Sequence, residues 1–123
     1  MGMNNNSRSR VTSAAVERYR FVVLASDGTV SAASASTDAP VGLTGASSYA
    51  SGENALVELV GVHKVTASAA ISAGSKVVCA ADGKAAADGG TTGDFVAGIA
   101  LDAAAADGDV IEILFTPGLP ANP

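Results

Sequence analysis

Two side chains in this sequence have the reactivity for nucleophilic or metal chemistry: His63 and Cys79, its single histidine and single cysteine. A nucleophilic triad needs a base close to a serine or cysteine, and a zinc site needs several converging ligands. His63 stands beside Lys64 after an apolar stretch, which is typical of a solvent-facing residue at a strand end. Cys79 lies in an apolar run, where a thiol usually behaves as a small apolar side chain. We therefore expect no enzyme, no internal disulfide and synthesis in a reducing cytosol.

Acidic turns are the next candidates for chemistry. Asp107-Gly108-Asp109 and the loop over residues 88–94 could offer carboxylate oxygens to calcium. Neither has the regular Asp/Asn spacing, closed by a glutamate, of a calcium loop, and hairpin turns explain both better. The glycine-rich stretches also lack the Gly-Lys-Ser/Thr ending of a phosphate loop. Eleven acids in residues 21–123 leave a catalytic carboxylate pair open, although nothing singles one out. We expect no cofactor, no metal and no small-molecule substrate.

The N-terminal arginines are the group best suited to binding. Residues 1–20 carry four arginines against one glutamate, whereas residues 21–123 carry three lysines against eleven acids. Because phosphate binding needs clustered basic residues, the acidic body should repel nucleic acid, and the basic segment is better suited to an acidic protein surface. An ordinary solubilising tail is the alternative. The candidate contact residues are Arg8, Arg10, Val11, Arg18 and Arg20.

The sequence also contains an internal repeat, in which residues 21–59 align with residues 76–113. Phe21-Val22-Val23-Leu24-Ala25-Ser26-Asp27-Gly28 falls on Lys76-Val77-Val78-Cys79-Ala80-Ala81-Asp82-Gly83. Gly42 then aligns with Gly98, and Val16 with Ile71. A duplicated β-unit without conspicuous chemistry in either copy usually builds a surface rather than an active site.

Short apolar segments separated by Gly/Asp turns predict an all-β sandwich or barrel-like domain. Asp-Gly pairs supply the positive φ angles of tight hairpin turns. One helical turn over residues 102–106 is also expected, because alanine favours helix and Asp102 can cap it. The expected strands cover residues 20–24, 29–33, 41–43, 55–62, 65–67, 76–80, 95–101 and 110–116. Apolar residues on both sides of the 55–62 segment predict that both of its faces are covered.

These elements divide the chain into an extended N-terminal arm (residues 1–15), a single β domain (16–117) and a proline-rich tail (118–123). Within the domain, the repeats span approximately residues 11–62 and 65–117. Residues 1–10 are polar and should be disordered unless a partner orders them. The core of Val, Ile, Leu and Ala, with no tryptophan and three phenylalanines, is thin, which favours association between copies. We expect no signal peptide, because the first residues lack an apolar stretch, and no membrane span, because no apolar run approaches ~20 residues.

An ordered series of segments resembles the capsid cement, or head decoration, proteins of tailed double-stranded DNA phages. The resemblance covers roughly residues 11–117 and is carried by Ile71-Ser72-Ala73-Gly74-Ser75-Lys76-Val77, then Ala81-Asp82-Gly83-Lys84-Ala85, then Val96-Ala97-Gly98-Ile99-Ala100-Leu101. Val41-Gly42-Leu43, Gly52-Glu53 and Ala106-Asp107-Gly108-Asp109-Val110-Ile111 add to it.

The resemblance implies a small β-rich protein, commonly a homotrimer, that binds the outer surface of the mature head and bridges major capsid protein subunits. It implies no catalytic motif, and it places the N-terminal segment along a capsid subunit. The expected partners are the major capsid protein and further copies of the chain, and not nucleic acid, membrane or a small molecule. Two alternatives stay open: a tail, fibre or other surface β-domain binding protein, and an enzyme that uses buried carboxylates.

Overall fold

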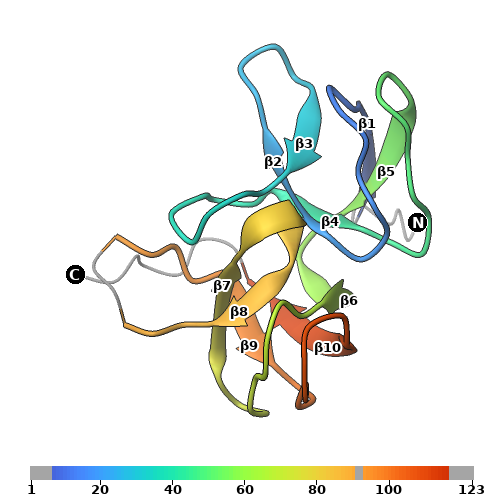
Figure 1. Cartoon of the computed structure of the whole chain (residues 1–123). Coiled ribbons are helices and arrows are strands. Elements are labelled where there is room, and N and C mark those ends of the chain that lie inside the picture. Colours follow the sequence, from blue (N-terminus) through green and yellow to red (C-terminus); the bar gives the residue numbers. More distant parts are fainter. Residues whose placement is uncertain (1–6, 91–92, 117–123) are drawn as a thin grey trace, which may run out of the picture.

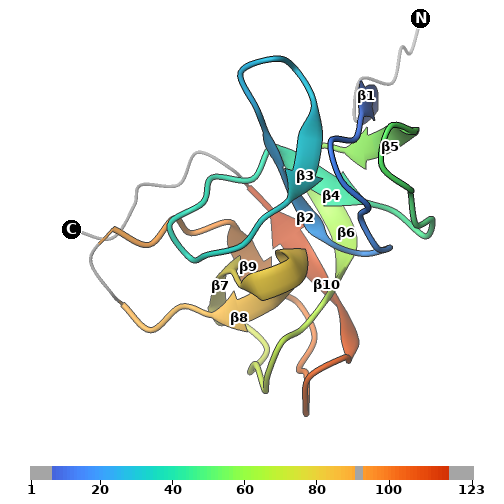
Figure 2. The same ribbon diagram turned by 45° about the horizontal axis from the view of Figure 1, so that its top comes forward.

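The computed structural model describes residues 7–90 and 93–116, which form two five-stranded antiparallel sheets (Figures 1 and 2). The first sheet has the order β1-β5-β4-β2-β3, with bounds β1 Ser7–Val11, β2 Phe21–Leu24, β3 Val30–Ala32, β4 Gly42–Thr44 and β5 Asn54–Glu58. The second has the order β6-β10-β9-β7-β8, with bounds β6 Gly61–Thr66, β7 Lys76–Cys79, β8 Ala85–Ala87, β9 Gly98–Ala100 and β10 Val110–Phe115. The predicted all-β sandwich is confirmed.

The two sheets are copies of one another, so the predicted repeat is also confirmed. Their strand orders are identical once β1–β5 are matched to β6–β10. Even the isolated bridges recur: Thr12–Val30 and Val16–Tyr49 in the first sheet correspond to Ala67–Ala85 and Ile71–Ala104 in the second. We call β1–β5 with their connections the first repeat and β6–β10 with theirs the second.

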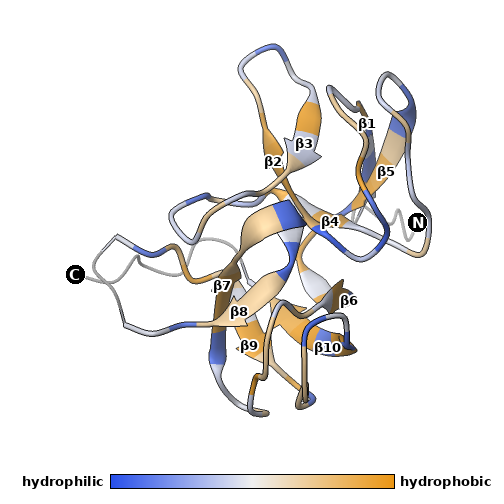
Figure 3. Ribbon diagram, in the orientation of Figure 1, coloured by the Kyte–Doolittle hydropathy of each residue, from blue (hydrophilic) through white to orange (hydrophobic). Residues whose placement is uncertain are grey.

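Each repeat buries an equivalent group of apolar side chains. Val16, Val22, Val30 and Val57 form the core of the first repeat. Equivalent positions in the second repeat hold Ile71, Val77, Ala85 and Ile113, all buried. Figure 3 shows the hydrophobic residues concentrated on strands such as β2, β7 and β10 and the hydrophilic residues concentrated on the loops. The alternating burial along β10 follows directly from the two-residue period of a strand with one covered face.

The repeats pack against each other through side chains and backbone. Phe21 and Leu43 of the first repeat are fully buried within the core of the second. The rings of Phe21 and Phe115 lie 5.9 Å apart, centroid to centroid. The N–H of Gly83 donates to the carbonyl of Ala33 at 2.6 Å, and the N–H of Thr66 to that of Tyr19 at 2.8 Å. The duplicated units therefore form one body.

The Asp-Gly turns adopt the left-handed backbone that the sequence predicts. Gly28 has φ 87°, and in the second repeat both Asp82 and Gly83 have positive φ, 61° and 71°. Asp82 and Gly83 lie within the short 3₁₀ turn η1 (Ala81–Gly83), between β7 and β8. Glycine and aspartate tolerate this region better than most residues, so the pair determines where each hairpin reverses.

The predicted helical turn over 102–106 is wrong. Ala104 exchanges two backbone hydrogen bonds with Ile71, and the N–H groups of Ala105 and Ala106 donate to the carboxylate of Asp109. The carboxylate of Asp102 accepts from the N–H of Glu112. The backbone groups that a helical turn would use are thus bonded to Ile71 and to the side chain of Asp109, which outweighs the small helical preference of alanine.

The single strand predicted over 55–62 is also wrong, because the chain leaves the first sheet after Glu58 and enters the second at Gly61. Gly61 has φ 138°, a conformation that a side chain rarely adopts. The expectation that both faces are covered fails too, since Leu56 is 44% and Val62 52% exposed. The segment joins the two repeats, so its apolar residues serve two different sheets.

The expectation that residues 1–10 lack structure by themselves is wrong for Ser7–Arg10, which pair with β5 as most of β1. Residues 1–6 and the proline-rich tail 118–123 lie outside the described residues.

The strand β8, Ala85–Ala87, was not expected from the sequence, because three alanines carry no β signal.

Candidate functional site

Three of the candidate arginines are exposed, two of them on the edge strand β1. Arg8 and Arg10 lie opposite Val57 and Ala55 of β5, and Arg18 lies in the connection to β2. The guanidinium of Arg8 donates to the carbonyl of its neighbour Ser7. Among the described residues none of these three arginines has an ion-pair partner. Their positive charges are therefore available to an acidic surface.

Val11 adds an apolar contact at the end of the same strand. It is 43% exposed and lies opposite Asn54, so Leu56 is its diagonal neighbour on one face of the sheet. β1 pairs only with β5 among the described strands, so its other edge presents backbone donors and acceptors without a strand partner. Arg8 and Arg10 project to one face of the sheet and Val11 to the other, so β1 offers cationic groups, an apolar group and free backbone groups on different sides of one edge strand.

Arg20 does not join this group. Its side chain is half-buried, and its Nη1 donates to the carbonyl of Asp82 at 3.1 Å. It borders a cleft of about 410 Å³ that is also lined by Glu17 and Lys84. The residue therefore tethers the start of β2 to the turn of the second repeat, a contact between distant segments that the sequence pattern could not reveal.

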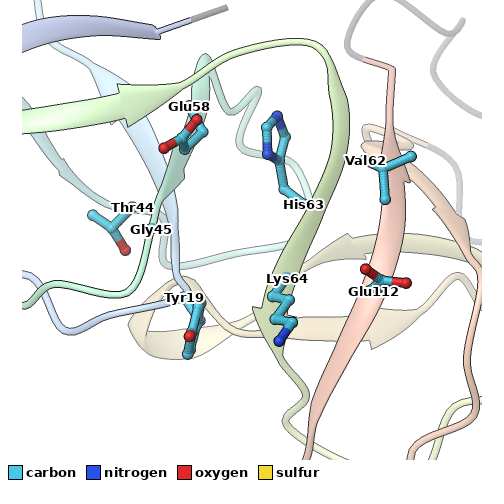
Figure 4. A pocket seen from close by; sticks show the side chains of 8 residues that line it. All are labelled: Tyr19, Thr44, Gly45, Glu58, Val62, His63, Lys64 and Glu112. Atoms are coloured by element: carbon cyan, nitrogen blue, oxygen red, sulfur yellow. The ribbon is translucent and has the colours of Figure 1, made fainter.

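A second cleft, of about 290 Å³, lies where the two repeats meet (Figure 4). Tyr19 contributes to it with a φ of 57°, whereas the equivalent position of the second repeat is Gly74 with φ 87°. A tyrosine in the left-handed region costs about 1–2 kcal/mol in backbone energy. The lining residues are Tyr19, Thr44, Gly45, Glu58, Val62, His63, Lys64 and Glu112. Sequence reasoning missed this cleft because its walls come from both repeats.

Two aspartates in turns of the first repeat, Asp27 and Asp38, accept hydrogen bonds that stabilise the local backbone. The Thr29 hydroxyl and N–H donate to the carboxylate of Asp27 and lower its pKa. The N–H of Ser34 donates to Asp38, which lowers the pKa of that carboxyl as well. Within the described part of the chain, no group of three or more His, Cys, Asp or Glu side chains could hold a metal ion.

The surroundings of His63 and Cys79 do not suit either side chain to a catalytic role. The imidazole Nε2 of His63 is hydrogen-bonded to the carbonyl of Leu59. Cys79 is a buried free thiol, and burial, with a smaller contribution from Asp38, raises its pKa to about 12. A thiol that stays protonated is neither a nucleophile nor a metal ligand.

This buried thiol predicts a loss of stability in alkaline solution. The pKa rises from an ordinary 9.0 to about 12 on folding, so below pH 9 the thiol is protonated in both states and contributes no pH dependence. Above that pH the unfolded chain releases the proton and the folded chain keeps it. The free energy of unfolding should then fall with rising pH, with a slope of up to about 1.4 kcal/mol per pH unit.

Urea unfolding at pH values on either side of 9 measures this effect. Cys79→Ala is the control, because it removes the thiol while leaving the other alkaline titrations in place. Identical pH profiles for the two proteins would contradict the assignment.

An all-β chain with unpaired arginines beside an edge strand has the features of a binding or assembly protein. The described residues include no helix with the length and apolarity needed to span a bilayer. The chain belongs to the phage cement protein family, whose model matches residues 4–115, and is thus a phage head-associated structural protein.

No curated protein matches the chain. Among solved structures, the N base of head fiber gp8.5 in bacteriophage phi29 is similar, with a TM-score of 0.70 and 21% identity. The match covers 93% of this chain and 97% of that one, and at this identity it supports the fold.

Proposed function

We propose that this protein is a capsid decoration protein that binds the outer surface of the mature phage head and bridges neighbouring major capsid protein subunits. The observation that carries the proposal is the family match over residues 4–115, which includes β1 and both sheets. The protein acts as a homotrimer without catalytic activity, and its partners are proteins. After synthesis in the host cytoplasm it resides on the outside of the virion.

The contact surface proposed for the capsid is the side of the molecule around β1. Arg8 and Arg10 are exposed on β1, and Arg18 in the connection to β2, without ion-pair partners in the described structure, and Val11 supplies apolar area on the other face of β1. Arg20 is excluded because it is engaged with Asp82. Each such contact is weak, but attachment through several copies in one oligomer multiplies weak contacts into stable binding.

The proposal predicts that the double variant Arg8→Gln/Arg10→Gln binds expanded capsids about tenfold more weakly, because two ion pairs to the shell are lost. Deleting residues 1–15 is a poorer test, since Thr12 is buried and its hydroxyl donates to the carbonyl of Ala50. Binding to capsids prepared without this protein is measured by co-sedimentation, and capsid rupture by a thermal ramp. Wild-type protein should raise the rupture temperature, and the double variant at equal concentration should raise it less.

The matched control adds the same change in net charge elsewhere, by Ala103→Glu/Ala105→Glu at exposed loop positions. It should bind like wild type. Unchanged rupture temperature with saturating wild-type protein would refute the stabilising role. Unchanged binding of the arginine variant would remove β1 from the contact.

The alternative function is the base of a head fibre. The solved neighbour is described as a head fiber N base, and it has nearly the same extent as this chain. Copy number per virion separates the two functions: occupancy of most equivalent capsid sites supports a cement protein, whereas an appended domain and partial occupancy support a fibre base.

A further inference from the structure

One row of side chains crosses each sheet at an equivalent place. Directly opposed residues of neighbouring antiparallel strands point to the same face, so a row can be followed from strand to strand. In the first sheet the row is Ser7, Glu58, Leu43 and Phe21. In the second sheet it is Val62, Leu114, Ile99 and Lys76.

The row of the first sheet is apolar where it is covered and polar where it is not. Phe21 and Leu43 are fully buried against the second repeat. Ser7 and Glu58, at the other end, are partly exposed. This distribution is what burial energetics require, because apolar area is stabilising only when removed from water.

The row of the second sheet has the opposite distribution. Val62 and Leu114 replace Ser7 and Glu58, yet they are 52% and 36% exposed. Ile99 is partly exposed beside them, and Lys76 stands where the first sheet has phenylalanine. Three adjacent apolar side chains thus face outward with no covering element among the described residues. A contiguous apolar surface of this kind marks an association site.

We propose that the row Val62–Leu114–Ile99 is the surface through which this chain binds another copy of itself. In the first repeat, Leu43, the equivalent of Ile99, is covered by a unit of the same fold together with its neighbour Phe21, so a second copy offers a partner of suitable shape for the row. The proposal deepens and rests on the proposed function, since it assigns a surface to the self-association included there.

Charges next to the row fit the same partner. Glu112 lies directly opposite Lys64, and this is the next pair on the same face of β10 and β6 after Leu114 and Val62. Neither charge has an ion-pair partner within 4.0 Å among the described residues. Charges of both signs beside an apolar row can complement a different surface on a second copy, which is the kind of contact that closes a homotrimer. Val62, Lys64 and Glu112 also line the cleft at the repeat junction, so the apolar row continues into a hollow that can receive a partner side chain (Figure 4).

Sedimentation velocity of the purified chain, without capsids, tests the proposal. Wild type should form a concentration-dependent oligomer. Leu114→Glu should raise the dissociation constant roughly tenfold or more, because it removes a leucine that association would bury and places an unpaired charge in the interface. Leu56→Glu is the matched control: Leu56 is 44% exposed on β5, the strand equivalent to β10. It should associate like wild type.

Circular dichroism verifies that the variants fold, and Val62→Asp provides a second disruption of the row if Leu114→Glu does not. A wild-type chain that stays monomeric at all concentrations overturns the inference, as does an oligomer unaffected by either row variant.

Capsid binding is measured separately. Oligomers that do not bind capsids refute the proposed function alone, and row variants that oligomerise normally but no longer bind capsids identify the shell as the occupant and overturn this assignment.

Discussion

Gly98→Ala is expected to lower the free energy of unfolding by about 3 kcal/mol or more. Gly98 lies in β9 between β10 and β7. A Cβ there would overlap the backbone carbonyl oxygen of Leu114 and come within 3.2 Å of the Cα of Phe115. Backbone atoms in the middle of a sheet cannot rotate away as a side chain can, so the strands must separate. Urea denaturation at constant m-value measures the loss.

Gly89→Ala is the control for this prediction. Gly89 is exposed, has no positive φ, and an added Cβ would meet nothing within 4 Å. Its replacement should leave stability unchanged or raise it slightly, because alanine reduces the entropy of the unfolded chain. Equal stabilities for the two variants would show that β9 can move away from β10 at little cost.

Local sequence signals predicted most of the strands and the duplication. The Val-Val stretches before Asp27-Gly28 and Asp82-Gly83 contain both the strand preference and the turn chemistry, so β2 and β7 begin and end close to their predicted bounds. Gly42 and Gly98 aligned in the sequence, and in the structure each allows the same close approach of a neighbouring strand. Repetition made these signals stronger than either copy alone.

The elements that were missed depend on contacts between distant segments. β1 is polar because it is an exposed edge strand, so its sequence lacks the apolar alternation that identifies strands. The apolar run over residues 55–62 reads as one strand, but it is divided between two sheets by the positive φ of Gly61. Nothing in the local pattern indicates that Leu59 and Val60 connect the repeats.

The candidate site was predictable in its charge and not in its geometry. The excess of arginines in residues 1–20 was visible in the sequence, but it could not separate the exposed Arg8 and Arg10 from Arg20, which binds the carbonyl of Asp82. The apolar row of the second sheet was also hidden, because the exposure of Val62 and Leu114 depends on how the repeats pack. The assignment of the contact residues around β1 remains a prediction.

Phe21→Ala is expected to produce the largest loss of stability, about 3–5 kcal/mol, because it leaves a cavity at a fully buried position. Phe21 belongs to β2 of the first repeat, but its ring packs against Phe115 in the core of the second. Removing it therefore weakens the contact that makes one body out of two thin cores. Since typical domains are stable by only about 5–15 kcal/mol, much of the chain should unfold at modest urea concentrations.

Phe21→Leu is the matched variant, since it keeps most of the apolar volume while removing the aromatic contact. It should lose clearly less stability than Phe21→Ala in the same urea titration. The equivalent position of the second repeat is the exposed Lys76, so Lys76→Ala should cost almost no stability. Comparing it with Phe21→Ala tests whether the loss comes from burial between the repeats rather than from truncating a side chain on an equivalent strand. If Phe21→Ala unfolded at the same urea concentration as Phe21→Leu, the other contacts between the repeats, those of Leu43 and of the backbone, would be sufficient, and the buried ring would not be what joins them.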